Sequence, residues 1–267
     1  MFITTNICYF TIMVLLSLYE ATAIVLPVPA NPPPFSYVGT FYTPTVKSFI
    51  NSTYNSYPPS CLGVNDTSHA RFQSSHTTIV FNASSYTTYE PFYNSTQTSL
   101  VLGVAHDTHG QALLVNYRSN SGGTVLQSTN IYPHITLSVQ GSGIYSAVYS
   151  NTLWSRIIMA GFVKITSYDS FGKPLTIAIN RSYKSSSCDT CNKRTSFNMN
   201  SPAYKHANIV SGTLPAVTIS GNIYELTPFY AIVFNTYKNP RFLTGTVCVS
   251  SAWDFNTGKC HSVGYNG

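Results

Sequence analysis

The chain has 267 residues, enough for one large or two modest domains that each bury a core. Only 8% of the residues are charged, against about a quarter in an ordinary soluble protein, while 43% are hydrophobic and 14% aromatic, which argues against a disordered chain. The formal charge is +6, but the Lys and Arg residues are scattered and do not alternate with aromatic residues along one stripe. Nucleic acid is therefore not an expected partner.

The first 23 residues have the features of a cleaved signal peptide, although they lack the usual positive charge at the start. An apolar run over residues 7–18 precedes the small-residue site Ala21-Thr22-Ala23 and is too short to span a bilayer. No later segment reaches transmembrane length. We expect a product that begins near Ile24 and enters the secretory pathway. A proline-rich linker that runs extended is predicted over residues 24–34.

The chain after the signal peptide carries five Asn-x-Ser/Thr sequences, the acceptors of N-glycosylation. One such sequence means little, but five beside a signal peptide predict a glycoprotein of the secretory pathway. The asparagines are Asn51, Asn65, Asn82, Asn94 and Asn180.

The cysteines also point to that compartment. Loss of the signal peptide removes Cys8 and leaves an odd number, so at least one thiol is free or pairs with another chain. Zinc ligation is an alternative, but the last two cysteines lack the short spacing of a zinc knuckle. In an oxidising compartment we expect disulfides, and no metal or other cofactor. The remaining cysteines are Cys61, Cys188, Cys191, Cys248 and Cys260.

Short apolar or alternating runs recur along the chain, separated by turn-rich spacers. Within residues 135–139, Ile, Leu and Val alternate with Thr and Ser, the pattern of a strand with one wet face. No long run combines helical apolar spacing with capping residues. The chain should therefore be mainly β, with a sandwich or jelly roll. The runs are 77–81, 100–105, 112–117, 135–139, 144–149, 157–166, 175–179, 216–220, 230–234 and 246–249.

Two polar segments contain residues that suit a catalytic or binding site. The segment His106-Asp107-Thr108-His109 has residues suited to a metal or a catalytic triad, but it lies between two apolar runs and ends at Gly110, which favours a hairpin turn. The densest basic segment spans residues 181–194. It either meets an anionic sugar or sulfate or is a solvated loop, and the loop is favoured. Its cations are Arg181, Lys184, Lys193 and Arg194.

Four stretches resemble, in their order and spacing, the hemagglutinin-esterase glycoproteins of coronaviruses and toroviruses. They are residues 143–149 (GIYSAVY), 200–204 (NSPAY), 241–246 (RFLTGT) and 254–258 (DFNTG). In that family, a sialate O-acetylesterase of the SGNH type carries an inserted jelly-roll lectin domain. The resemblance implies a mainly β protein with a degenerate esterase-like region over residues 35–125. A jelly-roll-like β-sandwich lectin domain would follow over residues 126–267.

The same resemblance implies that the esterase machinery is incomplete. The family's nucleophilic serine falls at Phe41, whose ring cannot attack an ester. The oxyanion hole of the family uses a Gly and an Asn. Residues 80–86 correspond to that stretch and have neither residue at the matching position. Its Asp-x-x-His pair lies in a segment beyond Gly267. We therefore expect no enzymatic activity and no catalytic residue.

The lectin part matches the family better. The family's Lys-Phe-Leu-Ser contact stretch corresponds position by position to Arg241, Phe242, Leu243 and Thr244. By this resemblance, the two apolar residues flank an acetyl methyl, while the first and last offer donors to carboxylate or carbonyl oxygens. A second contact region carries over Thr190. The alternative for residues 241–244 is an amphipathic strand end without a ligand.

The resemblance, taken with the signal peptide and the sequons, implies a secreted viral glycoprotein, extracellular or on the virion surface. It would bind sialylated cell-surface glycans, O-acetylated ones among them, without esterase activity. One alternative is a secreted viral accessory glycoprotein that binds a host surface protein, such as an immune receptor. Another is a fragment similar to the N-terminal domain of a coronavirus spike. No transmembrane segment is expected after signal cleavage, and self-association into a homo-oligomer is left open.

Overall fold

A computed structural model describes residues 37–54, 74–81, 87–118, 124–141, 143–180 and 205–261. All of these lie in one compact unit. The expected signal peptide and the linker over 24–34 lie outside the described residues. No helix in the described ranges is long and apolar enough to cross a membrane.

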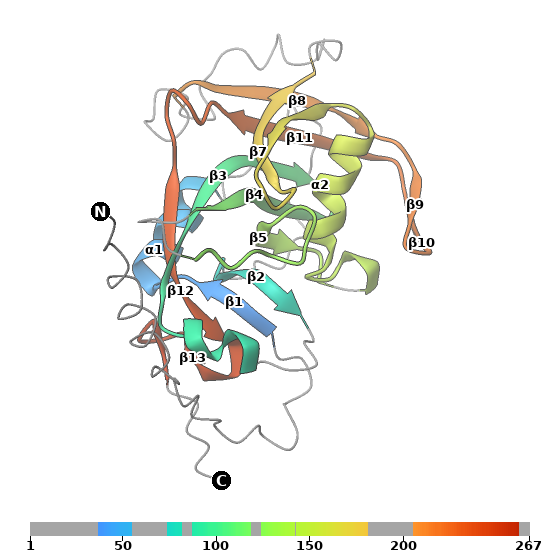
Figure 1. Ribbon diagram of the computed structural model, residues 1–267. Coiled ribbons are helices and arrows are strands. Elements are labelled where there is room, and N and C mark those ends of the chain that lie inside the picture. The colour runs from blue at the N-terminus through green and yellow to red at the C-terminus, as the bar shows by residue number, and fades with distance from the viewer. Residues whose placement is uncertain are drawn as a thin grey trace, which may run out of the picture. The chain divides into compact units, whose positions relative to one another are not determined.

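The prediction of a mainly β protein is confirmed, with two short α-helices and three 3-10 helices (η) among the described strands (Figure 1). In chain order the elements are β1 (Tyr37–Phe41), α1 (Pro44–Tyr54), β2 (His76–Phe81), η2 (Thr87–Phe92), β3 (Thr96–Asp107), β4 (Gly110–Arg118), β5 (His134–Val139), η3 (Gly143–Tyr145), α2 (Tyr149–Met159), β6 (Val163–Tyr168), β7 (Pro174–Ile179), β8 (Ala207–Leu214), β9 (Val217–Ile219), β10 (Asn222–Tyr224), β11 (Thr227–Phe234), β12 (Phe242–Val249), η4 (Ser250–Ala252), β13 (Trp253–Asp254) and β14 (Lys259–Cys260).

Strand β3 is the centre of an eight-stranded antiparallel sheet. One edge of β3 pairs with β4, which pairs in turn with β5. The other edge pairs with β12 over the first half of β3 and with β11 over the second half. From there the sheet continues to β1 and β2 on one branch and to β8 on the other. The regions expected over 35–125 and 126–267 thus contribute strands to the same sheet.

The sheet curls into a half-barrel, in which β2 lies beside the segment that precedes β5. The hydroxyl of Ser128 donates to the carbonyl oxygen of Thr78 at 2.7 Å, and the amide of Thr129 donates to that of Ile79 at 2.7 Å. Register shifts interrupt the ladders of β1 with β2, β3 with β4 and β4 with β5. Bulges of this kind increase local twist and bend a strand.

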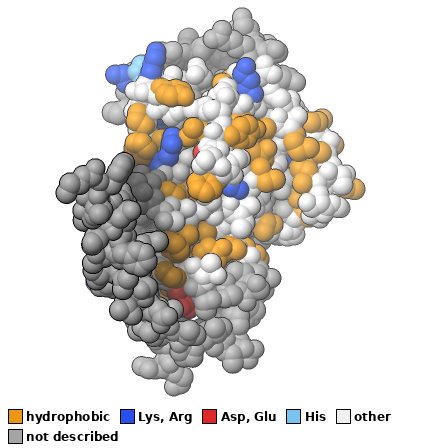
Figure 2. All heavy atoms as spheres, viewed as in Figure 1, with side chains coloured by type: hydrophobic (Ala, Val, Ile, Leu, Met, Phe, Trp, Pro, Cys, Tyr) orange, Lys and Arg blue, Asp and Glu red, His pale blue; other side chains and the backbone are white. Residues whose placement is uncertain are grey.

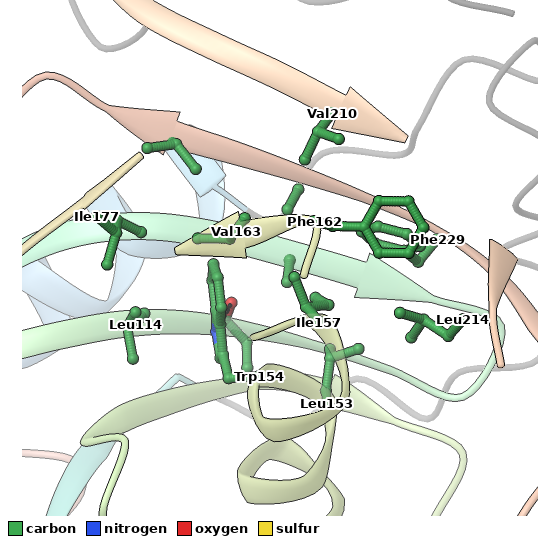
Figure 3. Packing of buried hydrophobic residues seen from close by; sticks show 14 of the residues in the cluster. Leu114, Leu153, Trp154, Ile157, Phe162, Val163, Ile177, Val210, Leu214 and Phe229 are labelled. Atoms are coloured by element: carbon green, nitrogen blue, oxygen red, sulfur yellow. Dashed lines mark hydrogen bonds between the residues drawn. The ribbon is translucent and has the colours of Figure 1, made fainter. Parts of the chain in front are cut away.

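The two faces of the sheet carry separate cores. Helix α1 covers one face, where Ile50 and Tyr54 pack with inward residues of β3, β4 and β11. Helix α2 and the β6–β7 hairpin cover the other face (Figure 3). There Leu153, Trp154 and Ile157 point from α2 toward the sheet, and the indole of Trp154 donates to the carbonyl oxygen of Ala112 at 3.2 Å.

The position of α2 corrects two predicted strands. Residues 144–149 form η3, a turn and the start of the helix, and residues 157–159 form its last turn before β6 begins at Val163. The apolar side chains that face the sheet follow a spacing of three and four residues, which suits a helix. Additional apolar residues between these positions obscure the helical spacing. The sequence pattern therefore predicts a strand where the structure has a helix.

The C-terminal strands β13 and β14 pair with each other and are tied to β12 by a disulfide between Cys248 and Cys260, with Cα atoms 5.7 Å apart. The expectation of disulfides is confirmed for this pair. Cys61, Cys188 and Cys191 lie outside the described residues. The disulfide packs against Phe41 and Trp253, whose ring centroids are 5.1 Å apart.

Candidate functional site

The predicted contact stretch 241–244 divides between the two faces of β12. Leu243 is buried in the core beneath α1, and Arg241 lies on the same side, over the ring of Phe234. Phe242 and Thr244 are exposed on the opposite face. A ligand on the protein surface therefore meets Phe242 and Thr244 together but not Leu243. The fifth predicted contact, Thr190, lies outside the described residues.

The guanidinium of Arg241 is engaged within the protein. The side chain is 9% exposed, and its carbon CZ lies 4.1 Å from the centroid of the Phe234 ring. Nη1 donates to the carbonyl oxygen of Asn239 at 2.9 Å, and Nη2 donates to that of Lys205 at 3.1 Å. Arg241 thus ties the turn before β12 to the turn before β8.

The face of β12 that carries Phe242 and Thr244 continues across two neighbouring strands, although Thr98 is only 6% exposed and Arg118 is half-buried. In the register of the sheet, Thr244 lies opposite Thr98 of β3, and Thr98 lies opposite Arg118 of β4. The hydroxyl oxygens of Thr98 and Thr244 are 3.2 Å apart, a hydrogen-bond distance. Since neighbouring strands are about 4.8 Å apart, this row spans roughly 10 Å from Thr244 to Arg118.

Strand alternation places Arg118 on the same face as Phe242. The preceding residue, Tyr117, points into the half-barrel, where its hydroxyl donates to the carbonyl oxygen of Thr77 at 3.0 Å. Asn116 points to the opposite face, where it is covered by the β6–β7 turn and donates to Asp169. Successive strand residues face opposite sides, so Arg118 lies on the same face as Asn116, where it is half-buried. No described acidic residue forms an ion pair with Arg118. We call Thr98, Arg118, Phe242 and Thr244 the outer patch.

The side of the outer patch toward β6 and β7 is fixed by polar contacts. Asn116 is fully buried, and its Nδ2 donates to Oδ2 of Asp169 at 2.8 Å. The other carboxylate oxygen of Asp169 accepts from the amides of Phe171 (2.9 Å) and Lys173 (2.8 Å). The Lys173 ammonium donates to the carbonyl oxygen of Asn130 at 2.8 Å. Oδ1 of Asn116 is buried and has no partner among the described residues.

Arg118 was missed at the sequence level. The alternation of residues 113–118 signals that Asn116 and Arg118 share a face, but it does not say which strands lie beside them. Only the pairing of β3 with both β4 and β12 brings Arg118 into one row with Thr244.

The position matched to the esterase nucleophile lies elsewhere. Phe41 is fully buried on β1, and its ring stacks against Trp253 and lies 5.4 Å from the His76 ring. Of the residues matched to the oxyanion hole, only Val80 and Phe81 belong to the described residues.

The segment 106–109 contains the last two residues of β3 and the predicted hairpin turn, in which Thr108 and His109 connect β3 to β4. Asp107 is buried and accepts from the amides of His109 and Gly110, each at 2.9 Å, and from the Tyr149 hydroxyl. These contacts give the aspartate a structural role in the turn. Within the described ranges, no group of three or more His, Cys, Asp or Glu residues is placed to hold a metal ion.

Three of the predicted glycosylation acceptors are described. Asn94 is exposed in the turn before β3, where its φ of 65° puts it in the left-handed region. Asn51 lies in α1, and its amide oxygen accepts from the Ser74 hydroxyl at 2.8 Å. Asn180 follows β7 and is half-buried. Asn65 and Asn82 lie outside the described residues.

Comparison with known proteins gives this chain no relative. No model of a protein family matches it, and neither a curated protein nor a solved structure does. The resemblance to hemagglutinin-esterases therefore rests on the four sequence stretches alone. Residues 143–149, 241–246 and 254–258 lie in the described part, whereas 200–204 do not.

Proposed function

We propose that this chain is a secreted viral glycoprotein that attaches to sialylated glycans through the outer patch and does not cleave them. The observation that carries the proposal is the row of Thr244, Thr98 and Arg118 beside the exposed ring of Phe242. In this proposal the curled antiparallel sheet corresponds to the jelly-roll-like lectin part of the hemagglutinin-esterases. The sequons and the signal peptide expected from the sequence support an extracellular site of action.

The chemistry of the outer patch suits a sialic acid. A guanidinium pairs with a carboxylate through two parallel hydrogen bonds, and Arg118 has no competing ion pair among the described residues. The exposed hydroxyl of Thr244 both donates and accepts, as the amide and hydroxyl groups of the sugar require. The buried hydroxyl of Thr98 lies 3.2 Å from it and orients it from below. The ring of Phe242, 55% exposed, offers an apolar wall for an acetyl methyl.

The absence of esterase activity is part of the proposal. Phe41 takes the place of the nucleophile in the match to the family and is fully buried against Trp253. A serine at this position would be covered by the same aromatic rings. The parts of an acyl-transfer site act as a unit, so the loss of the nucleophile removes most of the catalysis. Purified protein should release no acetate from O-acetylated sialosides above background.

The test is binding of a multivalent display of the secreted protein to a sialoside array and to red cells. Arg118→Ala, Phe242→Ala and Thr244→Val should each weaken binding by tenfold or more, because a lost charge-assisted hydrogen bond alone costs about 1.5–3 kcal/mol. Multivalent display amplifies such losses.

Matched controls lie away from the outer patch. Phe49→Ala removes an equally exposed ring (50%) from α1, on the opposite side of the sheet. Lys164→Ala removes an exposed cation from β6. Both variants should bind like the wild type. If sialidase treatment of the cells leaves wild-type binding unchanged, the proposal is wrong.

A host protein is the second candidate partner, and one surface favours it. Ile223 and Leu226 are 74% and 65% exposed and lie three positions apart in the chain, on either side of Tyr224 and Glu225. The ring of Tyr224 lies beside α2. Exposed aliphatic side chains that lie close together are typical of protein contacts. A pull-down from sialidase-treated cells separates the two candidates, since Ile223→Ser would weaken capture only if a protein is bound here.

A further inference from the structure

Two neighbouring turns present basic side chains where β11 ends and β8 begins. The turn at 205–206 precedes β8, and the turn at 235–239 follows β11. The amide of Asn235 donates to the carbonyl oxygen of His206 at 3.3 Å, and Nδ2 of Asn239 donates to that of Lys205 at 3.4 Å. Arg241 binds both turns through the carbonyl oxygens of Lys205 and Asn239. The two turns are therefore held side by side.

The side chains on these turns face solvent. Lys205, His206 and Lys238 are exposed, and Tyr237 is 84% exposed. We call these four residues the basic corner. In Figure 2, Lys or Arg side chains flank a histidine at the upper left, where Figure 1 places the start of β8.

No described carboxylate neutralises the basic corner. The ion pairs of the described part join Asp107, Glu225 and Asp254 to other partners. Asp169 binds the β6–β7 turn and Asn116. The ammonium groups of Lys205 and Lys238 thus have no acidic partner among the described residues, and the formal charge of +6 adds to the attraction for an anion.

We propose that the basic corner binds a sulfated polysaccharide of the glycosaminoglycan class. Sulfate groups pair with the compact charges of lysines and need no guanidinium fork. The exposed ring of Tyr237 gives a flat apolar surface on which a sugar ring packs, while its hydroxyl remains free to meet polar groups. The two lysines sit on adjacent turns, so a single chain with repeated charges contacts both.

A lipid surface fits the basic corner less well. Peripheral membrane binding combines basic residues with several apolar side chains that enter the interface. Among the exposed large hydrophobic residues, only Tyr237 lies on these two turns. The polysaccharide is therefore the favoured ligand. Anionic vesicles serve in the experiment as the alternative ligand.

The basic corner is separate from the outer patch. It shares no residue with Thr98, Arg118, Phe242 and Thr244. Arg241, which fixes its two turns, points to the opposite face of β12 from Phe242. Binding of sulfated polysaccharide and binding of sialosides can therefore succeed or fail independently.

The experiment measures binding of the full secreted chain to immobilised heparin, the probe for this ligand class, at physiological salt. Lys205→Ala combined with Lys238→Ala should weaken binding roughly tenfold or more and lower the salt needed for elution, because two charge-assisted contacts are lost. Tyr237→Ala should weaken binding several-fold. The matched control combines Lys164→Ala with Lys259→Ala, which removes the same charge from two exposed lysines on β6 and β14.

The results separate the alternatives. The proposal holds if the corner variant loses binding and the control variant keeps it, with sialoside binding unchanged in both. Equal losses in the two variants would show that net charge alone attracts heparin and would overturn the proposal. Absence of wild-type heparin binding would do the same, as would retention on phosphatidylserine vesicles without retention on heparin.

Discussion

Asp107 and Arg156 form an ion pair inside the protein, with Oδ2 of the aspartate 3.7 Å from Nη1 of the arginine and both side chains removed from water. Nη1 also donates to the Tyr149 hydroxyl at 2.9 Å. Nη2 donates to the carbonyl oxygens of Pro215 at 3.2 Å and Glu225 at 2.5 Å. One arginine of α2 therefore joins the β3–β4 turn to the segments on either side of the β9–β10 hairpin.

Loss of this arginine should destabilise the fold strongly. Burial raises the pKa of Asp107, while its hydrogen bonds and the charge of Arg156 oppose that rise. Arg156→Met keeps the packing volume but leaves Asp107 buried without its cation, which typically costs about 3–5 kcal/mol. Urea denaturation followed by circular dichroism measures the free energy of unfolding.

A double-variant cycle checks the cause. Asp107→Asn removes the charge and keeps an oxygen for the turn amides. Combined with Arg156→Met, it should cost less than the sum of the two single changes, because the single arginine change alone leaves a buried unpaired charge. Strict additivity would mean that the two residues stabilise the fold separately.

His76 should make stability depend on pH. Burial, followed by the charge of His134, lowers the pKa of His76 to about 4, whereas an unfolded chain has a histidine pKa of about 6.5. Between these values the unfolded state binds a proton that the folded state does not, so stability falls as pH falls from 6.5 to 4. The expected loss from pH 7 to pH 5 is about 1–2 kcal/mol, measured by denaturation at each pH.

The control for this prediction is His76→Phe, which suits the aromatic surroundings of Tyr37 and Phe41. The readout is the slope of the free energy of unfolding against pH, compared between the variant and the wild type, and not the absolute stability. Burial also lowers the pKa of His134, which therefore retains part of the dependence in the same direction. If the slope of stability against pH is the same in His76→Phe as in the wild type, His76 has the same pKa in the folded and unfolded states and the prediction is wrong.

The disulfide between Cys248 and Cys260 should contribute about 3 kcal/mol, the chain-entropy value for a loop of this length. The two cysteines are 12 positions apart. The double variant with alanine at both positions should unfold at lower urea concentration. Its m value should rise, because the unfolded chain loses a cross-link and exposes more surface. Equal stability of the two proteins would contradict this prediction.

The sequence predicts the class of the fold better than its details. Alternation in residues 135–139 and the many turn residues identify strands, and the strand over 134–139 is present. Helix α2 was missed because its 11 residues carry apolar side chains beyond those that face the sheet, including exposed Met159. Local pattern does not separate a short buried helix from a strand in such a stretch.

The candidate site shows a different limit. Once residues 242–249 are known to form a strand, period-two alternation alone separates Phe242 and Thr244 from Arg241 and Leu243. That signal is present in the sequence, whereas the match to the family treats all four residues as contacts. The contribution of Arg118 depends on the register of β3 with two partners, which arises from tertiary structure.

The sequence match and the structure assign different roles to Arg241. The sequence match makes it a ligand donor, whereas its hydrogen bonds and its position over Phe234 make it a support for two turns. Arg241→Ala should therefore lower the free energy of unfolding by about 1–3 kcal/mol, since the carbonyl oxygens of Asn239 and Lys205 lose a charged donor and a cation–π contact is lost. Per folded molecule, sialoside binding should stay near the wild-type level, in contrast to Phe242→Ala.

Arg241→Lys keeps the charge without the fork of the guanidinium and should fall between wild type and Arg241→Ala in stability. If Arg241→Ala abolishes sialoside binding while the free energy of unfolding is unchanged, the arginine contacts the ligand and the geometric interpretation is wrong.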